Sequence, residues 1–203
     1  MLRLFLLIFT IISINTLSSQ TIQEYDKILK IENLKFNTNE IRVYKKYAIS
    51  TGLELFRFYQ DDKENWKAEF YETIASSNKD SEKITLRTRK SKLNSLKNFE
   101  LIWAQILDTD VIYLPKWQAF EYKLEKKNKK YEIEDGKIIS STSVSYILDG
   151  SSYHVKIKNG KQENEIEYSN PESYLKTYPN VDELISFKEL LDLLKNDFKI
   201  FSK

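Results

Sequence analysis

Three turn dipeptides divide residues 131–168 into short alternating segments. They are Asp135-Gly136, Asp149-Gly150 and Asn159-Gly160. Both positions of such a pair can take a positive φ at low cost, so these pairs suit the type I′ turns of tight β-hairpins. Apolar and polar residues alternate between the turns, as they do in a half-buried strand. The sequence therefore predicts an antiparallel meander of four strands over Tyr131–Tyr168.

The same alternation appears earlier in the chain and predicts further strands. Strands are expected at Ile41–Tyr47, Leu53–Tyr59, Trp66–Thr73 and Lys83–Arg89, and the polar loop Asp61–Asn65 makes a hairpin of the second and third. Gln118–Leu124 alternates as well, and we interpret it as another strand.

Apolar residues three and four positions apart predict helices. We expect helices at Thr21–Asn33, at Ser95–Leu107 with Asn94 or Ser95 as its cap, at Pro171–Tyr178, and a last one that begins at Asn180. In the last of these, Asn180 and Glu183 have capping-box spacing. Five apolar residues on one side of this helix should pack against the core: Leu184, Phe187, Leu191, Leu194 and Phe198.

Strands followed by helices, twice over, indicate the α+β class, with antiparallel β-meanders and helices packed on one face. A chain of 203 residues suits one domain, which we place at residues 20–203. The repeated order leaves two interpretations open. Residues 20–115 and 116–203 could be duplicated halves, or their hairpins could look alike only because all amphipathic hairpins alternate.

The first residues have the layout of a secretory signal peptide. Arg3 precedes an apolar run, Leu4–Ile14, and small residues follow it. The run is shorter than the roughly 18 residues expected of a membrane span. We therefore expect residues 1–19 to be a signal peptide, a mature chain that begins at Ser19 or Gln20, and export to the periplasm or beyond. An uncleaved anchor or a buried first strand is the alternative.

Composition argues against several classes of function. The chain has no cysteine, which excludes disulfides, thiol nucleophiles, thiolate metal sites and lipid attachment at a lipobox. Its net charge is only +2 and comes mostly from lysine, so nothing favours a nucleic-acid partner. Four glycines leave no phosphate-cradling or dinucleotide motif. We expect no cofactor and no bound metal.

Candidate catalytic residues are few. His154 is the only histidine, and alternation places it with Lys156 and Lys158 on the strand face that we expect to meet water. Ser76-Ser77-Asn78-Lys79 matches the S-x-x-K pattern of penicillin-recognising enzymes, but it lies in an expected polar linker and the companion motifs are absent. Carboxylate pairs suited to glycoside hydrolysis are Asp61-Asp62, Asp108 with Asp110, and Glu132 with Glu134.

Aromatic and basic residues supply candidates for a binding surface. Trp66 and Trp103 fall on expected core faces, whereas Trp117 and Tyr113 flank Pro115 and are our candidates for an exposed binding surface. We interpret the basic run Lys123–Lys130 as the charged tip of a hairpin.

The stretch DGSSYHVKIKNGKQENEIEYSNPESYLKTYPNVDEL, together with IYLPKW, resembles small exported bacterial proteins that are themselves uncharacterised. This resemblance covers the last third of the chain and implies export, but it assigns no functional residue. The chain contains few His, Cys and Gly residues, which do most nucleophilic, metal and phosphate chemistry. This composition favours a non-enzymatic protein that binds another macromolecule, as an inhibitor, an immunity-type protein or an adaptor. A hydrolase that cleaves polysaccharide or peptide with Asp and Glu is the alternative. Two carboxylates facing each other across a cleft would favour the hydrolase, and an exposed apolar patch would favour binding.

Overall fold

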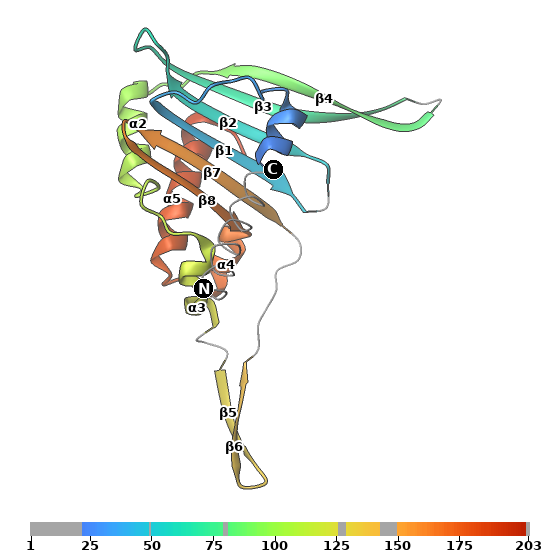
Figure 1. The fold of residues 1–203 in the computed structure, drawn as a ribbon, viewed down its shortest axis with the longest axis vertical. Helices are drawn as coiled ribbons and strands as arrows, with labels where there is room; N and C mark the ends of the chain where they lie inside the picture. Colours follow the sequence, from blue (N-terminus) through green and yellow to red (C-terminus); the bar gives the residue numbers. More distant parts are fainter. Residues whose placement is uncertain (1–21, 49, 79–80, 126–128, 143–149, 202–203) are drawn as a thin grey trace, which may run out of the picture.

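A computed structural model describes residues 22–201 except 49, 79–80, 126–128 and 143–149. The expected signal peptide and its cleavage site therefore lie outside the described residues. Strands and helices form an antiparallel α+β fold, as the sequence predicts. Its two parts are a six-stranded sheet covered by helices and a two-stranded hairpin that stands apart from it (Figure 1).

The main sheet has the spatial order β4-β3-β2-β1-β7-β8, with every neighbouring pair antiparallel. Its strands are β1 Asn39–Tyr47, β2 Leu53–Gln60, β3 Trp66–Asn78, β4 Ser81–Leu93, β7 Ser151–Asn159 and β8 Gln162–Ser169. All four strands predicted in the first half are present, and β3 and β4 extend beyond the predicted ends. The central strand β1 joins the two halves of the chain, because it pairs with β2 on one side and with β7 on the other.

The predicted four-strand meander over Tyr131–Tyr168 is wrong in its pairing. β5 Lys129–Glu134 and β6 Lys137–Thr142 form a separate hairpin, and β7 pairs with β1 instead of β6. Burial explains the choice, because Val155 and Ile157 of β7 lie opposite apolar residues of β1 and become fully buried there. Each half of the chain thus has four strands followed by two helices. The four strands of the second half are nevertheless divided between two sheets, whereas those of the first half lie in one.

The turn dipeptides form two of these hairpins in different ways. Asp135 and Gly136 have φ values of 52° and 74° and connect β5 to β6, as a type I′ turn requires. Asn159 is instead the last residue of β7, and only Gly160 of that pair takes a positive φ, 62°.

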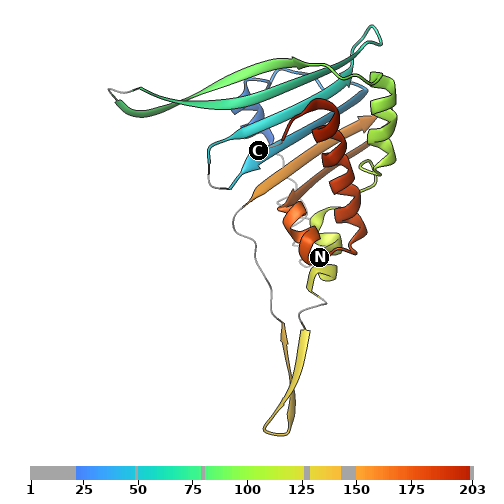
Figure 2. The same cartoon turned by 180° about the vertical axis from the view of Figure 1, so that it is seen from behind.

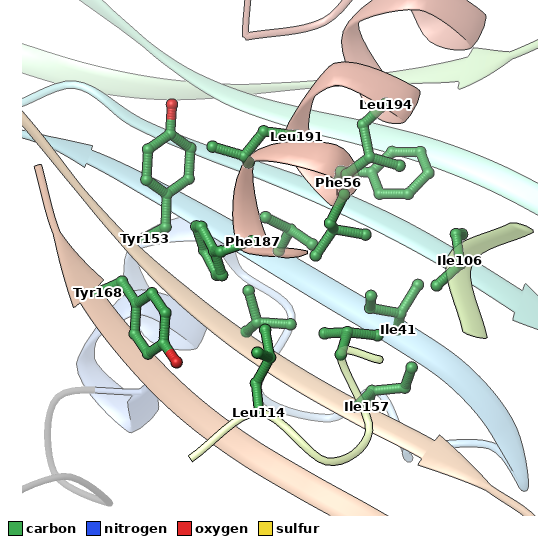
Figure 3. Close-up of a cluster of buried hydrophobic side chains, with 14 of the residues drawn as sticks. Ile41, Phe56, Ile106, Leu114, Tyr153, Ile157, Tyr168, Phe187, Leu191 and Leu194 are labelled. Atoms are coloured by element: carbon green, nitrogen blue, oxygen red, sulfur yellow. The ribbon is translucent and has the colours of Figure 1, made fainter. Parts of the chain in front are cut away.

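Four helices cover one face of the main sheet, which we call the helix face (Figure 2). They are α2 Phe99–Asp108, α3 Trp117–Glu125, α4 Pro171–Thr177 and α5 Asp182–Phe198. Figure 3 shows part of the core beneath them, where α5 places Phe187, Leu191 and Leu194 against the sheet. All five residues of the predicted stripe on α5 are buried, so this helix belongs to the core.

Both predicted helix caps are displaced. α2 begins after Asn98, whose Oδ1 accepts a hydrogen bond of 2.7 Å from the backbone N–H of Glu100, and neither Asn94 nor Ser95 caps it. α5 begins after Val181, without a side-chain cap, and Asn180 lies one residue outside the capping position.

The strand predicted at Gln118–Leu124 is a helix. Trp117, Phe120 and Leu124 lie three and four residues apart and pack against the core as part of α3. So short a run fits both the two-residue period of a strand and the 3.6-residue period of a helix. The helix forms because it packs Trp117 and Phe120 against the ring of Tyr168. Lys123 therefore belongs to α3, where its Nζ donates to Glu183 of α5 at 2.6 Å, and not to a hairpin tip.

A helix at residues 22–29 crosses the opposite face of the sheet, in front of it in Figure 1. Its Tyr25 and Leu29 pack against Tyr44, Leu55 and Tyr71, which point away from the helix face. The centre of the sheet is therefore covered on both sides, which alternation within the strands alone does not reveal.

Candidate binding surface

The hairpin of β5 and β6 projects from the body of the molecule (Figure 1). Every residue from 130 to 141 is exposed. Four of them are large and apolar, with exposed fractions of 68% for Tyr131, 79% for Ile133, 77% for Ile138 and 44% for Ile139. A two-stranded hairpin is at best marginally stable alone in water. These side chains are thus available for contact with another surface.

The strand register gathers three of the apolar side chains on one face of the hairpin. Ile133 lies directly opposite Ile138, and Tyr131 lies opposite Ser140. Because residues two apart on a strand share a face, Tyr131, Ile133 and Ile138 form one apolar surface, which we call the hairpin patch. Ile139 lies on the other face, opposite Glu132.

The sequence contains the signal for this patch, but its three residues are not among the site candidates that the sequence suggests. The alternation over Tyr131–Tyr168 predicts amphipathic strands, and such strands normally bury one face. That the hairpin stands apart from the main sheet is a property of the fold that the alternation does not contain.

Tyr113 and Trp117, the predicted surface residues, lie in different environments. Tyr113 is 67% exposed, and its hydroxyl accepts a hydrogen bond of 3.0 Å from Nε2 of Gln162. Trp117 is half-buried, with its ring 5.7 Å from that of Tyr168 and 5.1 Å from that of Tyr174. Only Tyr113 therefore offers most of its side chain to a partner.

The sheet face opposite α2–α5, which we call the charged face, carries a buried ionic cluster centred on Glu40. Glu40 is fully buried, and its Oε1 accepts from Nε of Arg42 at 2.6 Å and from Nε of Arg57 at 2.8 Å. Burial by itself would raise the pKa of Glu40, but Arg57 and Arg42 outweigh it, and the pKa lies below its ordinary value.

This cluster continues across β3 and β4. Glu69 accepts a hydrogen bond of 2.7 Å from the Tyr71 hydroxyl and pairs with Nζ of Lys90 at 2.9 Å. The Arg57 guanidinium stacks 3.8 Å from the centre of the Tyr59 ring. These groups are occupied by one another, which is typical of a cluster that fixes structure.

Further along the charged face, the Tyr44 hydroxyl donates to Asp26 of the helix at residues 22–29, at 2.6 Å. Burial, followed by the charge of Asp26 and this hydrogen bond, raises the pKa of Tyr44 well above its ordinary value. The contact joins the amino-terminal helix to the central strand.

His154 lies on the charged face with Lys156, as alternation predicts, but the prediction that it meets water is wrong. Only 3% of the residue is exposed. Its Nε2 is 3.1 Å from Oε1 of Glu165, and its ring meets Tyr44 edge-on with ring centres 6.3 Å apart. The reason is that β7 is an inner strand with neighbours on both sides, and Tyr44 on the adjacent strand covers the ring. Neither contact is with a nucleophile, so the histidine shows no Ser-His-Asp arrangement.

Two depressions lie near Tyr25 and Lys46, which line both. One of about 540 Å³ has Glu167 as its single carboxylate, among Ser151, Ser152, Ser169 and other residues. The other, of about 240 Å³, has Glu24 as its single carboxylate and is mostly apolar. Neither brings together the two facing carboxylates that glycoside hydrolysis requires.

The other catalytic candidates occupy structural positions. Asp61 closes the β2–β3 turn by accepting from the backbone N–H groups of Lys63 and Asn65, both at 2.9 Å. Asp108 and Asp110 lie at and just beyond the end of α2, and Glu132 and Glu134 lie on the exposed hairpin. Ser76–Asn78 end β3, so this segment is strand instead of linker, while Lys79 lies outside the described residues.

Over the described parts of the chain, no group of three or more His, Asp or Glu side chains is placed to hold a metal ion. In the same parts, no helix has the length and apolarity needed to cross a membrane. No family model, curated protein or solved structure matches this chain.

Proposed function

We propose that this chain is an exported, non-enzymatic protein that binds another protein, as an inhibitor, an immunity-type protein or an adaptor does. The hairpin patch is the observation that carries the proposal. Tyr131, Ile133 and Ile138 each expose more than two-thirds of their surface on an element that has little support of its own. Burying one such side chain contributes about 1.5–3 kcal/mol, so a partner that covers all three gains a substantial free energy.

The character of the hairpin favours a protein partner over a membrane. Its tip carries Glu134, Asp135 and Lys137, for a net charge of −1, so the tip offers no attraction to anionic lipids. Exposed apolar residues rimmed by charges are instead typical of protein–protein interfaces.

Two features support binding over hydrolysis. The depressions described above have one carboxylate each, and the buried carboxylates Glu40 and Glu69 are held by arginine and lysine side chains. Export rests on the sequence of the first 19 residues and on the resemblance of the last third of the chain.

Photo-crosslinking in the producing cell tests the proposal. A benzoylphenylalanine residue in place of Tyr131 or Ile133 should give covalent adducts with other polypeptides, and one in place of Leu96 should not. Leu96 is a matched control because it is fully exposed and apolar but lies before α2, on the main body of the molecule. Equal labelling from Leu96 and from the hairpin would contradict the proposal, as would the absence of adducts at both hairpin positions.

A further inference from the structure

The larger of the two depressions lies on the charged face and has the features of a small-molecule site. We propose that it binds a short peptide with free ends, whose ammonium group meets Glu167 and whose carboxylate meets Lys46. This inference goes beyond the proposed function, because it concerns the main sheet and not the hairpin patch.

Two serines form the floor of the depression. Ser152 of β7 and Ser169 of β8 lie directly opposite each other in the strand register, and Ser152 is two residues from His154. Because residues two apart on a strand share a face, both serines lie on the face that the helix at residues 22–29 crosses (Figure 1). Their short side chains leave a space of about 540 Å³ beside Tyr25 of that helix. Sites for small molecules usually have about 300–1,000 Å³.

The rim of the depression carries one positive and one negative charge. Lys46 of β1 lies opposite Ser152, and Glu167 lies two residues before Ser169, so both share the face of the serines. The Nζ of Lys46 is 5.6 Å from the centre of the Tyr25 ring. Burial and then the charge of Glu167 raise the pKa of Tyr25 to about 12. Both charges therefore lie near the same tyrosine.

The polar groups around the depression are available to a ligand. Among the described residues, five lining side chains form no hydrogen bond or ion pair: Tyr25, Lys46, Ser152, Glu167 and Ser169. The next carboxylate along β8 differs, because Glu165 is held by His154 at 3.1 Å and by Lys156 at 3.5 Å. A ligand with one ammonium group and one carboxylate would supply both missing partners through charge-assisted hydrogen bonds.

The separation of the two charges selects the length of the ligand. Lys46 and Glu167 belong to β1 and β8, which flank β7 and so lie about 9–10 Å apart at the usual strand spacing. A single amino acid carries both charges on one carbon and is too short to meet both side chains. An extended dipeptide or tripeptide spans about 7–11 Å. Its amide groups would then pass over the two serine hydroxyls, which can both donate and accept.

Titration of the purified protein with trialanine, followed by amide NMR spectra up to about 20 mM peptide, tests the inference. We expect a dissociation constant of about 0.1–1 mM, because the site is open and few contacts are fully desolvated. N-acetyl-trialanine lacks the charge that meets Glu167, and trialanine amide lacks the charge that meets Lys46. Each should bind at least about fivefold more weakly, and so should free alanine.

Two variants assign each end of the peptide to its side chain. Glu167→Gln should weaken the binding of trialanine at least about fivefold. It should leave the affinity for N-acetyl-trialanine unchanged, because the acetylated end has no charge for Glu167 to meet. Lys46→Met should behave in the same way toward trialanine and its amide.

A matched control uses an opposed pair on the same face of β7 and β8. Lys158→Met with Glu163→Gln should bind trialanine like the parent, because neither residue lines the depression. All the substituted side chains are at least partly exposed, so each variant should keep the unfolding midpoint of the parent within the usual small range of surface changes.

A parent whose spectra do not change up to about 20 mM trialanine would overturn the inference, because the expected affinity lies well within that range. Equal affinity for trialanine and its two blocked forms would overturn it as well, and so would spectral changes confined to residues away from the depression. These outcomes leave the proposed function untouched, since the hairpin patch is tested by crosslinking and not by peptide binding.

Discussion

The ionic cluster at Glu40 leads to a quantitative prediction about stability. Glu40→Gln preserves the size and shape of the side chain but removes its charge, so Arg42 and Arg57 would share a neutral amide in a buried site. Breaking a buried ion pair by removing one partner typically costs about 3–5 kcal/mol, because the remaining charge is left uncompensated. This loss is large against a typical free energy of unfolding of about 5–15 kcal/mol.

The neighbouring carboxylates limit the expected loss. Asp26 lies 3.9 Å from Arg42, and Glu69 lies 3.6 Å from Arg57, so each guanidinium keeps a second, more distant acceptor. Against this, the NH₂ group of the introduced glutamine would turn a donor toward side chains that can only donate. We therefore expect a loss near the lower end of the range, about 3 kcal/mol.

Denaturant unfolding at neutral pH, followed by tryptophan fluorescence, measures this loss as a lower midpoint with an unchanged slope. Glu72→Gln is the matched control, because Glu72 also pairs with an arginine across neighbouring strands, with Oε1 accepting from Nη2 of Arg89 at 2.7 Å. That pair is exposed, so its loss should cost less than about 1 kcal/mol. A Glu40→Gln variant within about 1 kcal/mol of the parent would show that the cluster does not stabilise the fold in this way.

The pKa of Glu40 adds a dependence on pH with a definite sign. A carboxyl whose folded pKa is lowered contributes stability that is fully present above its unfolded pKa, about 4.3, and is lost as the pH falls through the folded value. The difference between the parent and Glu40→Gln should therefore be constant above about pH 5 and narrow in more acidic solution. A difference that widens with acid would contradict this assignment.

Three further predictions concern the core, the histidine and the leader. Leu191→Ala should lower the free energy of unfolding by about 2–5 kcal/mol, because Leu191 is fully buried. As a control, replacing the exposed Glu189 of the same helix with alanine should change it by less than about 0.5 kcal/mol. Equal effects of the two changes in denaturant unfolding would show that the apolar stripe of α5 lies outside the core. His154→Ala should cost about 1–3 kcal/mol by the same assay, since it removes a buried ring and its hydrogen bond, and a change below about 0.5 kcal/mol would restore the solvent-facing interpretation. Protein recovered outside the cytoplasm should begin at Ser19 or Gln20 by intact mass, and a mass that retains residues 1–18 would disprove cleavage there.

Local periodicity was enough to predict most of the elements. The stripe on α5 and the alternation of β1, β2 and β7 depend only on which side of each element faces the core. At Gln118–Leu124 local information was insufficient, because so short a run fits both periods and the neighbouring apolar surface decided between them.

Pairing and coverage could not be predicted from the same patterns. Alternation correctly placed His154 and Val155 on different faces of β7, but whether the face of His154 meets water depends on Tyr44, which lies more than a hundred residues earlier in the chain. The same limitation applies to the candidate surface. Ile133 and Ile138 read as ordinary strand residues, and only the pairing of β7 with β1 leaves their hairpin without a covering layer.

The pairing of β1 with β7 also sets the order in which the chain can fold. Residues 39–47 emerge early in synthesis, but residues 151–159 must also emerge before the central strand has both neighbours. At a typical rate of about 5–20 residues per second, roughly 110 residues separate these events by about 5–20 s. During that interval Ile41 and Val43 lie in a strand with one unpaired edge, and α5 is not yet available to cover the sheet because it is made later still. Such edges recruit strands from other chains, so a nascent chain of this design gains from being held unfolded until its last third is available.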